Sequence, residues 1–470
     1  MNKYKRLVGN SLIFTIGSFG SRLITFLMVP LYTHVLTTAE YGTVDLITTT
    51  VNLLLPFLTI ELGKAALRFT IDNKNELDRN KIFSNINMHA IFLSIILILI
   101  SPIIIKLGLF ESYGFLFILL LIVKMFNELY SQYLRGLGLV RQFALNGILM
   151  TIVTVVSNLI LLVYFNFKIN GYISSMIIAA AFSNVFIFLC VSGYKRIKHF
   201  RIDLQLQKEM LAFSLPIVPS SAMWWIINGS TRYFVAFYVG ASANGLYAVA
   251  SKVPSIISLV ANIFTQAWQL SSFEEYDSDD RKSFYSNIFN LYWLVLLVGA
   301  SFIVVIIKPL ISIVVADSYF LSWQIVPFLL LGVVFESLSG FYGTIYQASK
   351  QTKGTFITSV FAGISSILVS MILVPYLGAI GAGISTAFSF FVMFFLRIFD
   401  TRKYVKIDIN IPQLIGSIIC YLIQVVLLFI LTGPQLYIIE LILFFIIIFI
   451  NYKPIFGLIT LLKSFILRKL

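Results

Sequence analysis

The stretch VNLLLPFLTIELGKAALRFT, residues 51–70, joins an apolar run to three charged side chains, Glu61, Lys64 and Arg68. Runs of about 20 apolar residues are typical of membrane-spanning helices, and similar runs recur throughout the 470-residue chain. Hydrophobic residues make up 59% of the sequence and charged residues only 11%, whereas a soluble domain carries roughly a quarter charged residues. The sequence therefore predicts an all-α polytopic membrane protein with charges inside its spans.

The apolar runs predict about fourteen transmembrane helices, the last of them short. A final segment, 453–470, has the pattern of an amphipathic tail that lies on the membrane surface. We expect the helices at about 8–33, 41–69, 82–105, 113–134, 144–165, 171–192, 210–238, 245–271, 284–307, 321–346, 356–376, 381–399, 412–432 and 436–452.

Lysine and arginine fall mainly on one side of this predicted topology. With the N-terminus taken as cytoplasmic, 26 of the 34 lysines and arginines lie in inner segments, whereas the outer segments carry Lys106, Lys168 and Lys308 only. Positively charged loops stay on the cytoplasmic side of a bilayer. We therefore expect both termini in the cytoplasm, and we attribute the net charge of +14 to topology and not to nucleic-acid binding.

The two halves of the sequence resemble each other. TTAEYGTV at 37–44 corresponds to GASANGLY at 240–247, which aligns Gly42 with Gly245, and FSNIN at 83–87 corresponds to YSNIF at 285–289. Each half holds six predicted helices, and an even number makes the repeat parallel. We expect two six-helix bundles with a cleft between them, at 1–206 and 207–405, followed by two extra helices and the amphipathic tail at 406–470.

Motifs for enzymatic chemistry are absent from the sequence. Cys190 and Cys420 both lie in apolar stretches, and His34, His89 and His199 show no metal-binding spacing. No Walker A loop is present, so the chain has no ATP site of that type. We expect no disulfide, no metal, no cofactor and no enzyme activity.

Three segments carry a family resemblance. Residues 9–47 (GNSLIFTIGSFGSRLITFLMVPLYTHVLTTAEYGTVDLI), 239–253 (VGASANGLYAVASKV) and 377–386 (LGAIGAGIST) resemble bacterial polysaccharide flippases. These are the O-antigen and exopolysaccharide transporters (Wzx type) of the multidrug/oligosaccharidyl-lipid/polysaccharide (MOP) exporter superfamily. The resemblance implies a V-shaped pair of six-helix bundles, as in MATE-type transporters, and a location in the bacterial plasma membrane. Fourteen helices are closer to its lipid II flippase branch.

The resemblance also implies a substrate and one site residue. The carrier would be undecaprenyl diphosphate, bearing an oligosaccharide. In lipid II flippases an arginine of helix 1, next to a serine, lies in a cationic central cavity, and Ser21-Arg22 matches that pattern.

Ionisable side chains recur within the predicted spans. An ionised group at the bilayer centre costs about 2.5–3.5 kcal/mol on insertion scales, so it usually faces a partner or a wet cavity. We expect the basic groups to bind pyrophosphate or glycan and the acidic groups to serve in ion coupling. The basic candidates are Arg22, Lys64, Arg68, Lys124, Arg232 and Lys252, and the acidic ones are Glu61, Glu128, Glu336 and Asp45.

Structural interpretations stand beside these functional ones. Glu61, Lys64 and Arg68 share one helix face, and Glu61–Lys64 could form a closed pair, as could Lys124–Glu128. Long basic side chains also reach toward the membrane surface, which is the alternative for Arg68, Arg232 and Lys252.

The predicted function is a flippase that moves undecaprenyl-diphosphate-linked oligosaccharides to the outer leaflet for surface polysaccharide biosynthesis. The two lobes would alternate in access, and without an ATP site the energy would come from H⁺, Na⁺ or the membrane potential. A polysaccharide polymerase is a further expected partner. The alternatives are a drug/cation antiporter of the same fold, a lipid II flippase, and a non-transporting scaffold for glycan assembly.

Overall fold

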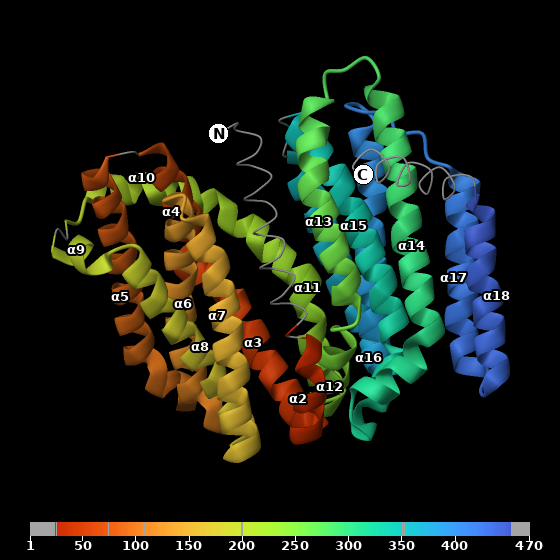
Figure 1. Ribbon diagram of the computed structural model, residues 1–470, viewed down its shortest axis with the longest axis horizontal. Helices are drawn as coiled ribbons and strands as arrows, with labels where there is room; N and C mark the ends of the chain where they lie inside the picture. The colour runs from red at the N-terminus through yellow and green to blue at the C-terminus, as the bar shows by residue number, and fades with distance from the viewer. Residues whose placement is uncertain are drawn as a thin grey trace, which may run out of the picture. The chain divides into compact units, whose positions relative to one another are not determined.

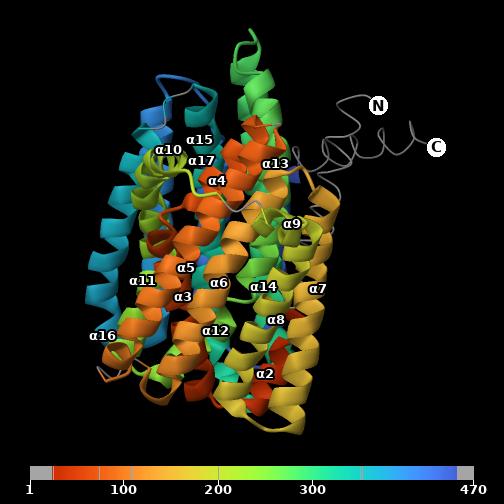
Figure 2. The same ribbon diagram turned by 90° about the vertical axis from the view of Figure 1, so that its left-hand side faces the viewer.

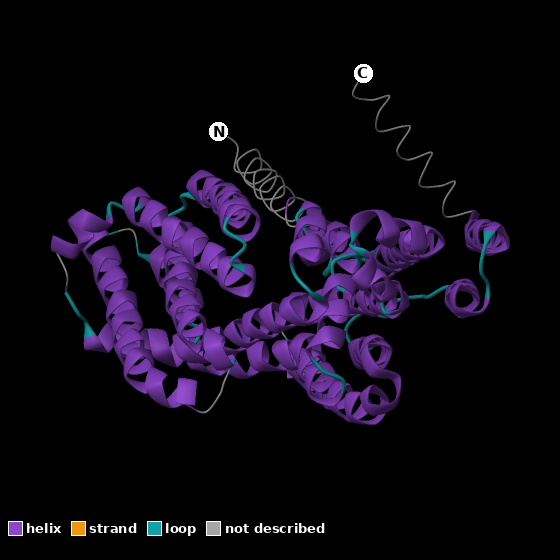
Figure 3. Ribbon diagram, turned by 90° about the horizontal axis from the view of Figure 1, so that it is seen from below, coloured by secondary structure: helices purple, strands orange, loops and turns teal. Residues whose placement is uncertain are grey.

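The computed structural model describes residue 24 and residues 26–452 except 74, 107–109, 199–200, 350 and 352. In this part of the chain all regular structure is helical (Figure 3). The chain divides into two compact units, one of residues 1–229 with 240–245 and the other of residues 230–239 with 246–470. This division reflects contacts within the chain and does not follow the internal repeat. The predicted lobes at 1–206 and 207–405 therefore stay a prediction.

Unit 1 is built around α6 and α8. Helix α6 packs on α3, α4, α5 and α8, and α8 packs on α7 (Figures 1 and 2). The elements are α2 (Val29–Val35), α3 (Thr38–Thr59), α4 (Leu62–Asp72), α5 (Glu76–Lys106), η1 (Glu111–Tyr113), α6 (Gly114–Gly136), α7 (Val140–Asn158), the π-helical turn η2 (Leu159–Tyr164), α8 (Lys168–Cys190), α9 (Gly193–Lys198), α10 (Leu204–Ser214), η3 (Leu215–Ile217) and the first part of α11 (Val218–Tyr238).

Unit 2 is built around α15, which packs on α13, α14 and α16. Helices α17 and α18 lie side by side and both pack on α14 (Figure 1). The elements are the end of α11, the second half of α12 (Ala241–Ala250), α13 (Pro254–Glu274), α14 (Arg281–Val314), η4 (Asp317–Gln324), α15 (Val326–Ala348), α16 (Lys353–Thr401), α17 (Ile411–Ile430) and α18 (Pro434–Ile450).

Ten helices among the described residues are long and apolar enough to cross a membrane, or eleven if α12 and α13 form one bent span. This confirms an all-α polytopic membrane protein, while the total of fourteen spans stays a prediction. Most of the helix predicted at 8–33 lies outside the described residues, as does the tail at 453–470.

Helix α16 contains two of the predicted spans. Its φ/ψ angles are not helical at Gly378, where φ is 57°. Ser370 Oγ lies 2.8 Å from Ser385 Oγ, and Arg397 Nε donates to Thr358 Oγ1 at 3.1 Å. These contacts join residues equally far before and after the kink, so the two halves run antiparallel. The hairpin matches the two helices predicted at 356–376 and 381–399.

Two predicted helices are interrupted in the structure. The segment 41–69 is broken between α3 and α4, because Ile60 and Glu61 both have left-handed backbone angles, with φ of 49° and 53°. The segment 245–271 is bent by 46° between α12 and α13. Apolar runs give the length of a span but carry no signal for such breaks.

The aligned glycines of the internal repeat meet in unit 1. A Cβ atom on Gly42 would lie 1.9 Å from the carbonyl oxygen of Ala241, and one on Gly245 would lie 1.9 Å from that of Thr38. Thr38 and Ala241 occupy the same place in the two repeats. The contact is therefore reciprocal, as in a two-fold interface, and only glycine lets the backbones approach this closely.

Candidate functional site

Lys124 lies in a cavity of unit 1 with a volume of about 390 Å³. Helix α6 supplies Lys124, and α7 supplies the hydroxyls of Thr151 and Thr154. Tyr32 of α2 and Tyr172 of α8 form an aromatic wall, with ring centroids 4.7 Å apart. The cavity therefore combines one cation with aromatic and hydroxyl groups, a combination suited to an anionic, sugar-bearing ligand.

A buried hydrogen-bond chain fixes the tyrosine wall. Asn158 Nδ2 donates to the hydroxyl oxygen of Tyr32 at 3.0 Å, and Ser175 Oγ donates to Asn158 Oδ1 at 2.8 Å. Asn158 and Ser175 are fully buried. Satisfied buried networks of this kind hold side chains in one arrangement, so the wall of the cavity is preorganised.

No acid lines the cavity beside Lys124 among the described residues, although the carboxylate of Glu128 acts on the lysine's charge from outside the lining. No carboxylate in the described ranges forms an ion pair with Lys124. The closed Lys124–Glu128 pair considered from the sequence is therefore not formed. Glu128 Oε1 instead accepts from Gln132 Nε2 at 3.1 Å, and Gln132 Oε1 accepts from Arg135 at 3.1 Å.

Glu61 and Lys64 lie together at the break between α3 and α4. The carboxylate of Glu61 is 3.1 Å from Lys64 Nζ, and it also accepts a hydrogen bond from Ser221 Oγ of α11. Ser221 in turn accepts from Lys64 Nζ at 3.2 Å. Glu61 is buried, whereas the side chain of Lys64 is 45% exposed. Glu61 lies at the break and not within a continuous helix, so the expectation of one continuous helix face is wrong. The Glu61–Lys64 ion pair considered from the sequence is formed.

The break itself is a Schellman-type helix end. The N–H groups of Ile60 and Glu61 donate to Phe57 O and Pro56 O at 3.3 and 3.2 Å. Such ends favour glycine at the left-handed position, and an L-residue there costs roughly 1–2 kcal/mol. His89 of α5 lies 2.9 Å from the freed carbonyl oxygen of Leu58, so tertiary contacts hold the break in place.

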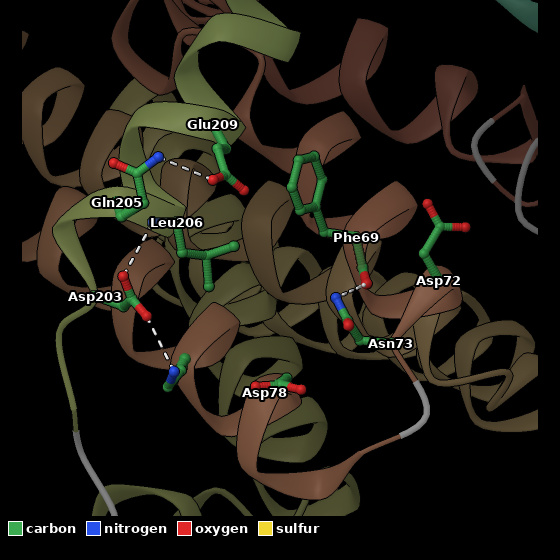
Figure 4. Close-up of a pocket in the computed structure, with 9 residues that line it drawn as sticks. Phe69, Asp72, Asn73, Asp78, Asp203, Gln205, Leu206 and Glu209 are labelled. Atoms are coloured by element: carbon green, nitrogen blue, oxygen red, sulfur yellow. Dashed lines mark hydrogen bonds and ion pairs between the residues drawn. The ribbon is translucent and has the colours of Figure 1, made fainter.

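A second cavity of unit 1, of about 460 Å³, lies between α4, α5 and α10 and carries mostly acidic and amide groups (Figure 4). Asp203 at its edge pairs with Lys81 at 3.0 Å, and Asp72 pairs with Arg68 at 3.1 Å. Arg68 thus reaches an acid near the end of α4 and is not brought to Lys124. This acidic lining does not suit a phosphate.

The remaining predicted residues lie elsewhere. Asp45 accepts from Asn244 Nδ2 at 3.3 Å in unit 1. In unit 2 the guanidinium of Arg232 lies 5.4 Å from the ring centroid of Tyr247, and Lys252 lies at the bend between α12 and α13. Glu336 of α15 is half-buried and forms no hydrogen bond or ion pair with the described residues. Arg22 lies outside the described residues.

Among the described residues, three buried charged residues were not predicted as site residues from the sequence: Arg196, which is 8% exposed and precedes α10, and two others. Arg397 is 4% exposed and Glu440 is fully buried. In the sequence Arg397 lies at the predicted cytoplasmic end of the helix at 381–399, among the cations assigned to inner segments. Glu440 stands alone in the apolar run ELILFFIIIF at 440–449, and this isolation within a span is the signal that could have found it.

The sequence profile described as "Polysaccharide biosynthesis protein" matches residues 7–269, more than half of the chain. The chain belongs to this family. No curated protein sequence gives a significant match.

Solved structures of the MOP superfamily share the fold of this polysaccharide biosynthesis protein. The "Lipid II flippase MurJ, inward closed conformation" is 14% identical with a TM-score of 0.72, over 95% of this chain and 100% of that one. An inward-facing multidrug resistance MATE family transporter is 15% identical with a TM-score of 0.66, over 82% and 95%. A MOP superfamily transporter from Pyrococcus furiosus is 16% identical with a TM-score of 0.57, over 84% and 95%. At these identities the likeness shows the fold, and the fold is the predicted one.

Proposed function

We propose that this protein is a flippase for lipid-linked oligosaccharides with a diphosphate carrier, active in surface polysaccharide biosynthesis. The family and the fold support a flippase of the MOP superfamily. The observation that carries the substrate class is the position of Lys124 in the cavity of unit 1, without an acid in the described lining. A phosphate group entering the cavity would supply the missing anion, and the tyrosine wall would face attached sugars.

The other basic candidates extend this proposal. In the predicted topology Lys64 and Arg68 lie toward the cytoplasm, Arg22 and Lys124 near mid-depth, and Arg232 and Lys252 toward the outside. A diphosphate that crosses a bilayer loses its hydration at every depth, so cations along the path would lower the barrier. The lipid tail would stay in the membrane while the lobes alternate in access, in a bacterial plasma membrane with cytoplasmic termini.

The main alternative is an antiporter of cationic drugs on the same fold. A cation-binding cavity should present a carboxylate, and none is among the described residues that line the cavity around Lys124. Lipid II translocation is chemically closer, because lipid II also carries a diphosphate. The cavity alone does not separate these two anionic substrates, so the glycan must be varied in the experiment.

Translocation by purified protein in vesicles tests the proposal. A fluorescent polyprenyl-diphosphate oligosaccharide would be placed in one leaflet and its appearance in the other measured. Replacing Lys124 by Met should slow translocation by about 10- to 150-fold, since a hydrogen bond to a charged group contributes about 1.5–3 kcal/mol. Lys124→Arg should retain more activity, because it keeps the charge.

The control is Lys106→Met, which removes an exposed lysine at the end of α5. Normal translocation by Lys124→Met, with wild-type insertion and yield, would refute the role of Lys124. Equal rates for lipid II and for the oligosaccharide substrate would favour a lipid II flippase or a broad one. Efflux of cationic dyes in place of glycolipid movement would favour the antiporter.

Energy coupling is tested in the same vesicles. We propose Glu61, Glu128, Glu336 and Asp45 as the acids that carry the coupling ion, with H⁺ and Na⁺ as candidates. Imposed gradients of pH, Na⁺ or membrane potential should accelerate wild-type translocation. When the coupling acid is changed to its amide, the gradient should no longer accelerate translocation, while the rate without a gradient should stay the same. The other amide variants should keep the rate without a gradient and the acceleration by it.

A further inference from the structure

Unit 2 contains a basic pocket at the predicted cytoplasmic end of the α16 hairpin. Its volume is about 460 Å³. Lys353, Lys403 and Tyr404 line its polar end, and Ile357, Phe361 and Leu396 line its apolar end. Lys353 and Phe361 are eight residues apart on one helix, which corresponds to about 12 Å along the axis. The pocket thus changes from basic to apolar in the direction from the membrane surface into the bilayer.

The apolar end opens to the outside of the unit. Ile357 is 42% exposed and Phe361 is 55% exposed, and Phe395 and Phe399 on the second half of the hairpin are exposed as well. Exposed large apolar side chains on a membrane-spanning helix face lipid chains. A molecule in the pocket can therefore place its polar end between the lysines and leave its apolar part in the bilayer.

A buried cation lies directly behind the pocket. Arg397 is 4% exposed, and its guanidinium donates to Thr358 Oγ1 at 3.1 Å, to Ser339 O at 2.7 Å and to Ser359 Oγ at 3.3 Å. All three acceptors are neutral, and no carboxylate in the described part of the chain pairs with Arg397. Thr358 also lines the pocket, so it separates the guanidinium from a bound ligand by one hydroxyl group.

Asp400 is the one acid among the described residues that line the pocket, and it is already engaged. Asp400 lies 2.7 Å from Lys403 Nζ and accepts from the Tyr346 hydroxyl at 2.7 Å. The hydrogen bond with Asp400 raises the pKa of Lys403, so this lysine stays charged. With Lys353, Lys403 and Arg397 against Asp400, the surroundings of the pocket carry a net positive charge. A buried cation without an anion is unfavourable, and an anionic ligand in the pocket would offset this cost.

We propose that this pocket binds the anionic headgroup of a phospholipid from the cytoplasmic leaflet. The phosphate would lie between Lys353 and Lys403, with Arg397 adding its field through Thr358, and an acyl chain would follow Ile357 and Phe361. The apolar end distinguishes this ligand from free phosphate, which has no part to place there. The site lies within unit 2 and does not depend on the transported substrate.

Lipid binding to the purified full-length protein tests the site directly. Spin-labelled phosphatidylglycerol and phosphatidylcholine would be titrated in nanodiscs, and the fraction held at the protein measured. We expect a preference for phosphatidylglycerol, and each of Lys353→Gln and Lys403→Gln should weaken it by about five-fold, since a lysine near an anionic surface contributes about 1 kcal/mol. Both lysines are exposed, so the variants should fold normally.

The matched control is Lys208→Gln, which removes an exposed lysine from the predicted cytoplasmic side of unit 1. It should leave the preference unchanged. An equal loss in this control would show diffuse attraction to the surface and overturn the proposal, as would equal binding of the two lipids by wild-type protein. Glycerol phosphate that competes as well as phosphatidylglycerol, or polyprenyl diphosphate that displaces it at lower concentration, would replace the phospholipid with another ligand and also overturn it.

Discussion

Gly42 and Gly245, which the internal repeat aligns, pack backbone against backbone in unit 1. A Cβ atom on either glycine would lie 1.9 Å from a carbonyl oxygen of the other repeat. Asn244, beside Gly245, adds a hydrogen bond to the carbonyl oxygen of Gly42 at 2.9 Å. The two repeats thus contact each other through corresponding atoms. A larger residue at either glycine would clash with the backbone of the other repeat.

Replacing Gly42 or Gly245 by Ala should destabilise the protein. We expect a loss of about 1–3 kcal/mol for each, as for other overpacked contacts, and the double variant should lose less than the sum because the helices have already moved apart. Gly299→Ala in α14 is the control, since a Cβ there meets no atom within 4 Å; it should be neutral or stabilising by about 0.5–1 kcal/mol. Thermal unfolding in detergent would measure this, and wild-type stability of Gly42→Ala would contradict the close contact.

Ser221 should contribute more to the α3–α4 break than Lys64 does. Ser221 donates to the buried carboxylate of Glu61, and a bond to a charged acceptor contributes about 1.5–3 kcal/mol. Lys64 is half-exposed although Glu61 is buried, so water screens their pairing and we expect it to contribute less. Ser221→Ala should therefore lower the unfolding temperature more than Lys64→Met. Ser220→Ala, at the exposed neighbouring position, is the control and should not change the unfolding temperature. A larger decrease in unfolding temperature for Lys64→Met than for Ser221→Ala would refute this account.

The junction of α5 and α10 should weaken in acid. Asp203 accepts from the N–H of Leu206 at 3.1 Å and pairs with Lys81, and these contacts, Leu206 first, hold the pKa of Asp203 below its ordinary value. A carboxyl with a lower pKa in the folded chain stabilises the fold above its unfolded pKa of about 3.9. That stabilisation is lost as the pH falls through the folded pKa.

Asp203→Asn isolates this effect, because Asn can still cap α10 but cannot pair with Lys81. At pH 7 the variant should unfold at a lower temperature than the wild type, and the gap should close in acid, below about pH 3.9. Tryptophan fluorescence during heating at several pH values would measure the gap. A gap that persists or widens toward low pH would contradict the assignment.

Glu440 should be replaceable by an apolar residue with a gain in stability. Both of its carboxyl oxygens are buried without a hydrogen-bond partner among the described residues, while Lys308 donates to Leu428 O at 2.7 Å and lies over Trp323. Leaving a buried polar group unpaired costs about 1–3 kcal/mol. We expect Glu440→Met to raise the unfolding temperature. A marked decrease would instead show that Glu440 and Lys308 depend on each other.

The sequence predicted the spans well where apolar content alone decides them. Residues 113–134 were expected and α6 covers Gly114–Gly136, because an apolar segment of this length has few alternatives in a membrane. The break at Ile60 could not be predicted, since a β-branched residue disfavours the left-handed region. Ser221 and His89, distant in sequence, hold it there.

The sequence predicted cations within the spans but not how the helices arrange the side chains around them. The sequence showed that Lys124 is an unusual charge within a span, yet it gave no signal that Tyr32 and Tyr172 would form a wall beside it. The i, i+4 spacing suggested a Lys124–Glu128 pair. However, Gln132 lies on the same helix face and donates a hydrogen bond to Glu128. Local spacing identifies possible partners, and packing between helices chooses among them.

The joint between α3 and α4 separates a rod that is long and apolar enough to span a membrane, Thr38–Thr59, from a shorter rod. Lys64 sits on the first turn of the shorter rod, so a change in the tilt of that rod carries a positive charge along the electric field of an energised membrane. Each elementary charge moved through 100 mV is worth about 2.3 kcal/mol. We therefore expect any flexing at this joint to move charge, which would be measured as a transient current even when no substrate crosses.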